Sequence, residues 1–316
     1  MAVIERTNVV DEAQIVSWEV SATPFSGSSG TLAGQCEPGG IVKDVTNNIL
    51  YQNEGTKASP YYTPVSYSQE GLLAYHSDGW KDQVSKAVAN TDASTMLSSG
   101  VRVFGQGIAE TDSGAVVASA EGGNEVTLTS TNEASHLAVL GTDAGIFQPD
   151  QHGACIVVDA EFAVSADLDT KTVAIGFVGT AADALDPPVT SSGTTLTLVQ
   201  DDLVLALMDA ALTDAAGIMI PHNKGNAAAS IETTATGVDT GSDIEAAGTY
   251  QRLRVELQRT TTTVKAVVFK DKAQIGSIAD ALDEDEECSP VLYIGSGTTS
   301  TEALAVRHFA TWGLRA

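Results

Sequence analysis

The sequence predicts an all-β protein in which a sandwich domain follows an extended, loop-rich N-terminal region. Two observations predict this class. Short runs of alternating or continuously apolar residues recur from Val101 onward, and clusters of Gly, Asp, Ser and Thr separate them. About ten such runs are typical of a two-sheet sandwich. We therefore divide the chain into an N-terminal arm and anchoring region, residues 1–100, and a sandwich domain, residues 101–316.

The N-terminal region shows little regular patterning. Residues 15–20 alternate weakly, and residues 25–34 form a loop of small side chains. Five of the seven tyrosines lie between residues 36 and 78, and Pro60 and Pro64 frame Tyr61 and Tyr62 in an extended or turn segment. Tyr is enriched at protein interfaces, so this region is a candidate contact surface. Ordinary packing of a loop-rich region explains the tyrosines equally well.

One helix is expected, between Asp78 and Leu97. Ser77 or Asp78 can cap it, Trp80, Val84 and Val88 fall at helical spacing, and Gly100 closes it. Its length fits a connector between the two regions.

The strands of the sandwich are expected within the apolar runs, and the turns within the small polar clusters between them. The run 203–211 has helical propensity, but its neighbours favour a buried strand. The expected strands are residues 115–118, 125–129, 154–164, 172–178, 194–199, 203–208, 218–221, 252–257, 264–269, 291–294 and 303–314.

Residues 250–272 give the clearest pattern, a hairpin. Leu253, Val255 and Leu257 face one side, and Arg252, Arg254 and Glu256 alternate with them on the other. The turns are expected at residues 260–263 and 270–272. Six basic and two acidic residues give this hairpin a net charge of +4. The charged side is either a solvated sheet face or a contact with an acidic neighbouring subunit.

The net charge argues against a nucleic-acid-binding protein. The chain carries 41 acidic and 16 basic residues, a net charge of −25, so it lacks the clustered cations of a nucleic-acid-binding protein. The scarcity of Lys and the spread of acid along the chain favour a protein that works in high salt. An ordinary acidic protein is the alternative.

The cysteines and the hydropathy pattern narrow the class further. The three cysteines are widely spaced and odd in number, which fits folding in a reducing cytoplasm rather than a disulfide framework. No apolar run of about 18 residues predicts a membrane span, and the first residues do not resemble a secretion signal.

No motif for catalysis, a cofactor or a metal is found. The five His residues lack the spacing of a zinc site, and no phosphate-binding loop or nucleophile elbow occurs. Asp159 and Glu161 share one face of an expected strand, as in the paired carboxylates of retaining glycosidases, but the leading position holds Val157. Residues 283–287 form an acidic loop without the spacing of a calcium loop, so we expect it to be solvated.

Three stretches of the sandwich resemble tailed-virus virion proteins with a concanavalin-A-like or jelly-roll sandwich. The first is Val158-Asp-Ala-Glu-Phe-Ala-Val, followed by Val173-Ala-Ile-Gly-Phe-Val-Gly-Thr. The second is Pro188-Val-Thr-Ser-Ser-Gly-Thr-Thr-Leu with the apolar run to Asp209. The third is Thr249-Tyr-Gln-Arg-Leu-Arg-Val-Glu, a return strand, Ser289-Pro-Val-Leu-Tyr-Ile-Gly and a final strand through Trp312. The resemblance covers about two thirds of the chain, the part from about residue 104 onward, and residues 1–100 do not share it.

The resemblance implies a virion structural protein without enzymatic activity, specifically a capsid decoration (cement) protein made in the host cytoplasm. Its expected partners are the major capsid protein and its own copies in a homotrimer, with no nucleic acid and no membrane. Its candidate interface residues are Tyr61, Tyr62, Tyr67, Trp80, Arg252, Arg254 and Arg259. The rival hypothesis is a receptor- or glycan-binding module of a tail fibre or tail tip, in which the sandwich engages a host-surface glycan. The scarcity of aromatic residues for sugar stacking argues against that rival.

Overall fold

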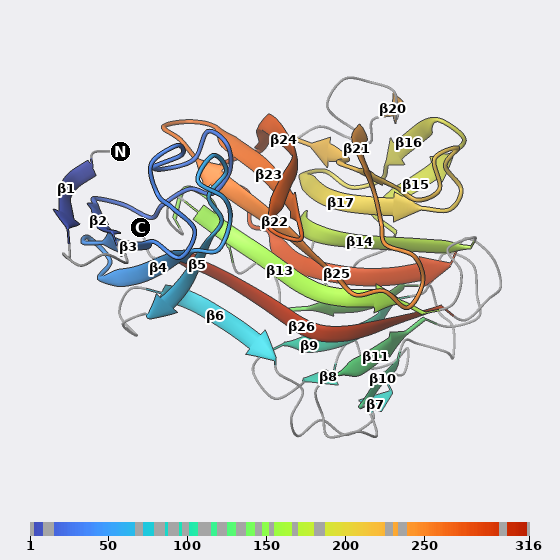
Figure 1. The fold of residues 1–316 in the computed structure, drawn as a ribbon. Coiled ribbons are helices and arrows are strands. Elements are labelled where there is room, and N and C mark those ends of the chain that lie inside the picture. Colours follow the sequence, from blue (N-terminus) through green and yellow to red (C-terminus); the bar gives the residue numbers. More distant parts are fainter. Residues whose placement is uncertain are drawn as a thin grey trace.

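A computed structural model describes residues 3–8, 16–66, 72–78, 86–87, 95–96, 101–106, 115–118, 125–130, 137–142, 147–151, 155–165, 170–179, 187–224, 230–232, 239–296 and 302–314. Every regular element within these ranges is a β-strand, which confirms the predicted all-β class. The strands form four sheets (Figure 1). No helix among the described residues is long and apolar enough to cross a membrane.

One large sheet, here called the β13 sheet, has nine strands and only antiparallel pairs. Its order is β24-β23-β22-β13-β26-β11-β10-β7, with β6 also paired to β26. Its strands are β6 Leu72–Asp78, β7 Lys86–Ala87, β10 Ala115–Ala118, β11 Val126–Thr129, β13 Cys155–Val164, β22 Gln251–Arg259, β23 Val264–Lys270, β24 Ala273–Leu282 and β26 Ala303–Leu314.

The second large sheet, the β14 sheet, also has nine strands, in the order β21-β18-β17-β14-β25-β12-β9-β8, with β19 paired to β17. Its strands are β8 Thr95–Met96, β9 Arg102–Gln106, β12 Leu137–Gly141, β14 Lys171–Val178, β17 Leu203–Asp209, β18 Gly217–Met219, β19 His222–Asn223, β21 Asp239–Asp243 and β25 Ser289–Ser296.

The main core lies between these two sheets. Alternate residues point to opposite faces of a strand, so β13 contributes Val158 and Phe162, β14 contributes Ile175, and β22 contributes Val255 to one buried apolar cluster. All four side chains are inaccessible to solvent. The predicted sandwich is therefore confirmed, and the long apolar runs of the sequence are the strands that line its core.

Two smaller sheets lie outside the sandwich, and each of the two regions packs on part of one outer face. The N-terminal sheet contains β1 Val3–Asn8, β2 Val16–Val20, β3 Ile41–Asp44, β4 Ile49–Asn53 and β5 Tyr62–Ser66, and it lies at one end in Figure 1. The flap contains β15 Val189–Ser192, β16 Thr195–Leu198 and β20 Ser230–Glu232. The N-terminal sheet has an apolar cluster of its own around Trp18, Val42 and Ile49, and residues 21–40 contain no strand.

The structure differs from the prediction in the segment before residue 101. Lys86–Ala87 pairs with β10 and Thr95–Met96 pairs with β9, so the predicted helix is wrong at these residues. The rest of residues 79–94 lies outside the described residues. Strands β6, β7 and β8 belong to the sandwich sheets, and the change of sheet falls between β5 and β6. Helical spacing in a short polar segment is a weak signal, and pairing with a neighbouring sheet edge overrides it.

Candidate functional site

Four of the predicted interface residues meet on the outer face of the β13 sheet. Arg252 and Arg254 stand on β22, and Tyr61 and Tyr62 lie at the start of β5 in the N-terminal region. Tyr61, Tyr62 and Arg254 are almost completely buried. The structure therefore brings these residues together at an interface within one chain, between the N-terminal sheet and the sandwich.

Arg254 is the centre of this internal interface. Its guanidinium carbon lies 4.2 Å from the centroid of the Tyr61 ring and 4.9 Å from that of the Trp312 ring. Its Nη2 donates to the Tyr62 carbonyl oxygen at 2.8 Å and lies 2.8 Å from Oε1 of Glu256. The two aromatic rings and the Glu256 carboxylate compensate part of the loss of water around this buried charge, while Nε and Nη1 of Arg254 make no hydrogen bond to any described residue.

Asp159, one of the paired carboxylates singled out in the sequence, belongs to the same interface. Arg252 binds it through Nε at 2.7 Å and Nη2 at 2.8 Å, and the Tyr61 hydroxyl donates to it at 3.0 Å. Burial opposes ionisation, but the hydrogen bonds and charge of Arg252 hold the pKa of Asp159 below its ordinary value. Because the carboxylate is ionised, buried and fully bonded, it cannot donate a proton to a glycosidic oxygen.

The remaining predicted residues lie apart from this interface. Arg259 ends β22 and forms an ion pair with Glu284 at 2.8 Å, at the edge of the acidic loop. Tyr67 and Trp80 lie outside the described residues. Burial and the neighbouring carboxylates raise the pKa of Glu286 in that loop. In the described part of the chain, no group of three or more His, Cys, Asp or Glu side chains could hold a metal ion.

A pocket opens on the opposite side of the sandwich, on the outer face of the β14 sheet. Its floor follows one row of paired residues across four adjacent strands, Asp209 on β17, Thr172 on β14, Gly295 on β25 and Leu137 on β12. Tyr293 stands two residues before Gly295 and therefore on the same face of β25. Because Gly295 has no side chain, the middle of this row is hollow.

The flap forms the roof of the pocket. Val189 and Leu196 of its hairpin pack on an apolar cluster that includes Leu205 and Val291 of the sheet below. A two-residue turn joins β15 to β16, and Gly193 adopts a positive φ of 62° there, which a glycine accommodates without strain. The backbone of this turn bonds to residues 211 and 213 just after β17. The hairpin is thus held over the sheet, and a cavity of about 210 Å³ remains beside it.

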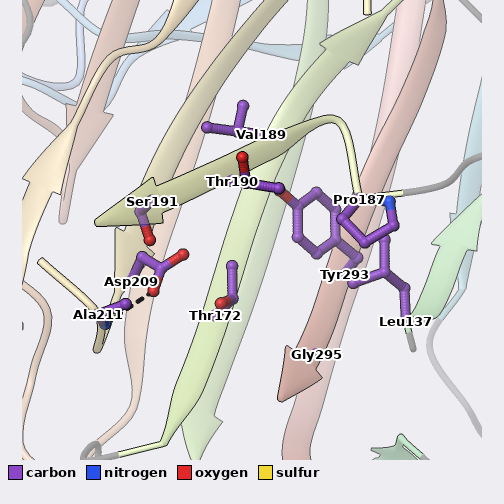
Figure 2. A pocket seen from close by; sticks show the side chains of 10 residues that line it. All are labelled: Leu137, Thr172, Pro187, Val189, Thr190, Ser191, Asp209, Ala211, Tyr293 and Gly295. Atoms are coloured by element: carbon purple, nitrogen blue, oxygen red, sulfur yellow. Dashed lines mark hydrogen bonds between the residues drawn. The ribbon is translucent and has the colours of Figure 1, made fainter. Parts of the chain in front are cut away.

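The pocket contains buried polar groups that lack partners. The Tyr293 hydroxyl and the Ser191 hydroxyl are inaccessible and make no hydrogen bond to any residue that the structure describes. Asp209, also buried, accepts one hydrogen bond at Oδ1 from the Ala211 N–H at 2.9 Å. Figure 2 shows the Tyr293 ring reaching from β25 toward Thr190, with Asp209 beside Ser191. Burial, together with the charge of Asp209, raises the pKa of Tyr293, so its phenol stays a hydrogen-bond donor.

The lining of the pocket restricts the ligands it can take. Asp209 is the one charged residue among the ten that line it, and the others are Leu137, Thr172, Pro187, Val189, Thr190, Ser191, Ala211, Tyr293 and Gly295. A buried carboxylate without a cation repels anions. Leaving a buried hydroxyl unbonded costs about 1–3 kcal/mol, and a ligand that bonds it removes this cost. The pocket therefore suits an uncharged ligand with several hydroxyl groups and an apolar side.

Sequence reasoning missed this pocket although two signals were present. Tyr293 and Gly295 alternate with the core residues Leu292 and Ile294, which places them on the outer face of their strand. Asp209 ends the apolar run of β17. No sequence signal indicates that the hairpin 189–198 folds back over this row.

Comparisons with known proteins place the chain in no family. No protein-family model matches the chain, and no curated protein matches its sequence. The solved structures similar to it include a protein of unknown function from Shewanella oneidensis MR-1, with 12% identity, a TM-score of 0.46, and coverage of 79% of this chain and 90% of that one.

Two further solved structures have names that refer to a lectin and a sugar hydrolase. A peanut lectin shows 10% identity and a TM-score of 0.42, with 77% of this chain and 98% of that chain covered. A 1,3-alpha-1,4-beta-D-galactose-4-sulfate-3,6-anhydro-D-galactose 4 galactohydrolase shows 11% identity and a TM-score of 0.43, with 80% and 99% covered.

Proposed function

We propose that the chain is a glycan-binding module that holds an uncharged saccharide in the pocket beneath the flap. The observation that carries the proposal is that Tyr293 and Ser191, whose buried hydroxyls make no hydrogen bond to any described residue, line the same cavity as Asp209. A ligand reaches these two hydroxyls when the flap above them shifts. A sugar ring has hydroxyls that donate to a carboxylate, oxygens that accept from a phenol, and C–H groups that pack on apolar side chains such as Pro187 and Val189. Each need of the ligand is met by a group in the lining.

The charge of the pocket sets its specificity. Asp209 and the absence of any Lys, Arg or His among the ten lining residues favour neutral sugars over sialylated, sulfated or uronic-acid sugars. The cavity volume of about 210 Å³ lies below the 300–1,000 Å³ or so of drug-sized ligand sites, so it suits a single terminal sugar residue.

A glycan array that contains neutral and acidic glycans tests this function. We expect wild-type protein to bind neutral glycans, and Tyr293→Phe and Asp209→Asn to lose most of that signal. Two matched controls, Tyr250→Phe and the exposed Asp201→Asn, should keep it. Binding that both pocket variants retain, or a preference for acidic glycans, would refute the proposal.

Capsid decoration stays a prediction. Tyr61, Tyr62 and Arg254, which the sequence suggested as contacts between subunits, are engaged within the chain and are buried there. They therefore lend no support to a contact with a capsid protein. Copy number separates the two hypotheses, since gel densitometry of purified virions would give hundreds of copies for a shell protein and at most dozens for a tail protein.

A further inference from the structure

The backbone of the flap is joined to the rest of the chain mainly at its turn. Among the described strands, β15, β16 and β20 form a sheet of their own, and none of them pairs with a strand of the β14 sheet. One isolated bridge, between Gly193 and Leu212, joins the turn of the flap to the loop after β17. The Gly193 N–H donates to the Ala211 carbonyl oxygen at 3.0 Å, and the Thr213 N–H donates to the Gly193 carbonyl oxygen at 2.8 Å. We call these two hydrogen bonds the latch.

The loop side of the latch is fixed to the sandwich. The Ala210 N–H donates to the Lys171 carbonyl oxygen at 2.9 Å, and the Asp209 carboxylate accepts from the Ala211 N–H at 2.9 Å. Lys171, at the start of β14, forms a buried ion pair with Glu302 at 2.8 Å. Because these contacts tie the loop to the β14 sheet, a movement that breaks the latch displaces the flap and leaves the loop in place.

The two ends of the flap hairpin differ in how many apolar contacts hold them. At the base, Val189 and Leu198 stand opposite each other in register, and both are buried in the apolar cluster on the outer face of the β14 sheet. Toward the turn, residues 191–196, here called the flap tip, contribute Leu196 alone to that cluster, and residues 192–194 are exposed. Lifting the flap tip, with β20 attached to it, therefore breaks the latch and withdraws one apolar side chain. Lifting the base as well would expose two more, at a higher cost in buried apolar area.

The flap tip separates the two buried hydroxyls of the pocket from solvent. Ser191 lies on the flap tip and Tyr293 on β25 of the floor (Figure 2), and both hydroxyls are inaccessible. Asp209, which lines the same pocket, is only 6% exposed. A saccharide that bonds either hydroxyl has to pass between the flap tip and the floor, so the closed arrangement blocks both entry and release.

We propose that the flap tip is a lid that opens by breaking the latch at Gly193, bends at the base of the hairpin, and closes again over a bound saccharide. The inference rests on the proposed function, since it concerns entry to the same pocket. The fraction of molecules in which the latch is broken sets the rates of binding and release. Because the latch forms in the free and the bound protein alike, its strength changes these rates and leaves the affinity unchanged.

Gly193 allows the latch to be weakened without a clash. Its φ of 62° lies in the left-handed region, and a Cβ added there would meet no atom within 4 Å. Gly193→Ala therefore disfavours the closed turn through backbone strain alone, whereas Gly193→Asn introduces a residue that tolerates this region. Both variants add a side chain at the same place, so Gly193→Asn is the matched control.

Thiol labelling of the full chain tests the lid without a ligand. Ser191→Cys places a thiol on the covered side of the flap tip, Ser192→Cys places one on its exposed side, and the three native cysteines are buried. With a small thiol reagent, we expect Ser191→Cys to react at least about tenfold more slowly than Ser192→Cys, and faster than the native cysteines. Adding Gly193→Ala should speed the reaction of Ser191→Cys about tenfold, and adding Gly193→Asn should change it by less than about twofold.

Three outcomes of the labelling would overturn the proposal. Equal rates for Ser191→Cys and Ser192→Cys would mean that the pocket is permanently open. Labelling of Ser191→Cys only at the rate of the native cysteines would mean that the flap moves only when the protein unfolds. Equal rates with Gly193→Ala and with Gly193→Asn would mean that the latch does not hold the lid closed.

Binding kinetics connect the lid to the proposed function. With the neutral glycan that binds wild type most strongly on the array, Gly193→Ala should raise the association and dissociation rates by the same factor as the labelling rate, and should keep Kd within about twofold of wild type. Unchanged association and dissociation rates would overturn the lid as the entrance to the pocket. If wild type binds no neutral glycan, the proposed function fails, and the labelling experiment still decides whether the flap tip is a lid.

Discussion

The two outer faces of the sandwich differ in how they hold buried polar groups, because ion pairs are present only on the β13 face among the described residues of the two sites. On the β13 sheet, Arg254 and Asp159 are buried beneath the N-terminal region and each has an oppositely charged partner, although Nε and Nη1 of Arg254 make no hydrogen bond to any described residue. On the β14 sheet, the hydroxyls of Tyr293 and Ser191 are buried beneath the flap without partners. A bonded buried charge attaches one part of the chain to another, whereas an unbonded buried hydroxyl is a cost that a ligand can remove.

The largest effect on stability is expected from Arg254→Met. The substitution keeps much of the side-chain volume but leaves Glu256, itself buried, without its cation. Breaking a buried ion pair in this way costs about 3–5 kcal/mol. Denaturant unfolding should show this loss, and the half-exposed Arg307, changed to Met as the control, should cost far less. Equal losses in the two variants would mean that the buried interface contributes no more than a surface contact.

Acid should weaken the same interface. The folded-state pKa of Asp159 is lowered, so its contribution to stability is complete above the unfolded pKa of about 3.9 and is lost as the pH falls through the folded value. Asp159→Asn lacks this dependence. The difference in unfolding free energy between wild type and Asp159→Asn should therefore shrink as the pH is lowered below about 4. A difference that stays constant would show that Asp159 has no lowered pKa.

Two Tyr→Phe substitutions remove the same hydroxyl group from each outer face, so their effects on stability can be compared directly. Tyr61→Phe removes a donor to the Asp159 carboxylate and should cost about 1.5–3 kcal/mol, as for a hydrogen bond to a charged group. Tyr293→Phe removes an unbonded hydroxyl and should leave the unfolding free energy unchanged or raise it by about 1 kcal/mol. If both variants lose the same stability, the Tyr293 hydroxyl has a partner and is not held for a ligand.

The salt concentration should have the smallest effect on the stability of the fold. The net charge of −25 opposes the compact state, and the Debye length falls from about 10 Å at 0.1 M to about 3 Å at 1 M salt. We expect the melting temperature to rise by a few degrees between about 0.1 and 2 M NaCl. A flat or falling curve would remove the hypothesis of a protein adapted to high salt.

The sequence predicts the strands of the sandwich better than it predicts the N-terminal region and the flap that pack on its outer faces. Residues 115–118 and 303–314 are strands with the predicted bounds, and the buried strand expected at 203–208 is present. Strand β24 was not predicted, because its small and polar residues lack the apolar alternation of a half-buried strand.

The sequence also did not predict which segments cover the two outer faces of the sandwich. The alternation of the 250–272 hairpin correctly placed Leu253 and Val255 in the core, but it gave two readings of Arg254, solvated or in contact with another subunit. The structure covers Arg254 with Tyr61 from the same chain. Periodicity shows which residues share a face, and it contains no information about which distant segment lies on that face. The floor of the pocket can be read from strand patterns in part, but its roof cannot.

Isothermal titration calorimetry with the neutral glycan that binds most strongly on the array compares the two tyrosines as binding residues. If the pocket beneath the flap is the binding site, Tyr293→Phe should weaken binding about tenfold, the equivalent of one hydrogen bond of about 1.4 kcal/mol, and Tyr61→Phe should bind as wild type does. Equal affinity of wild type and Tyr293→Phe would contradict the assignment of the pocket as the glycan site.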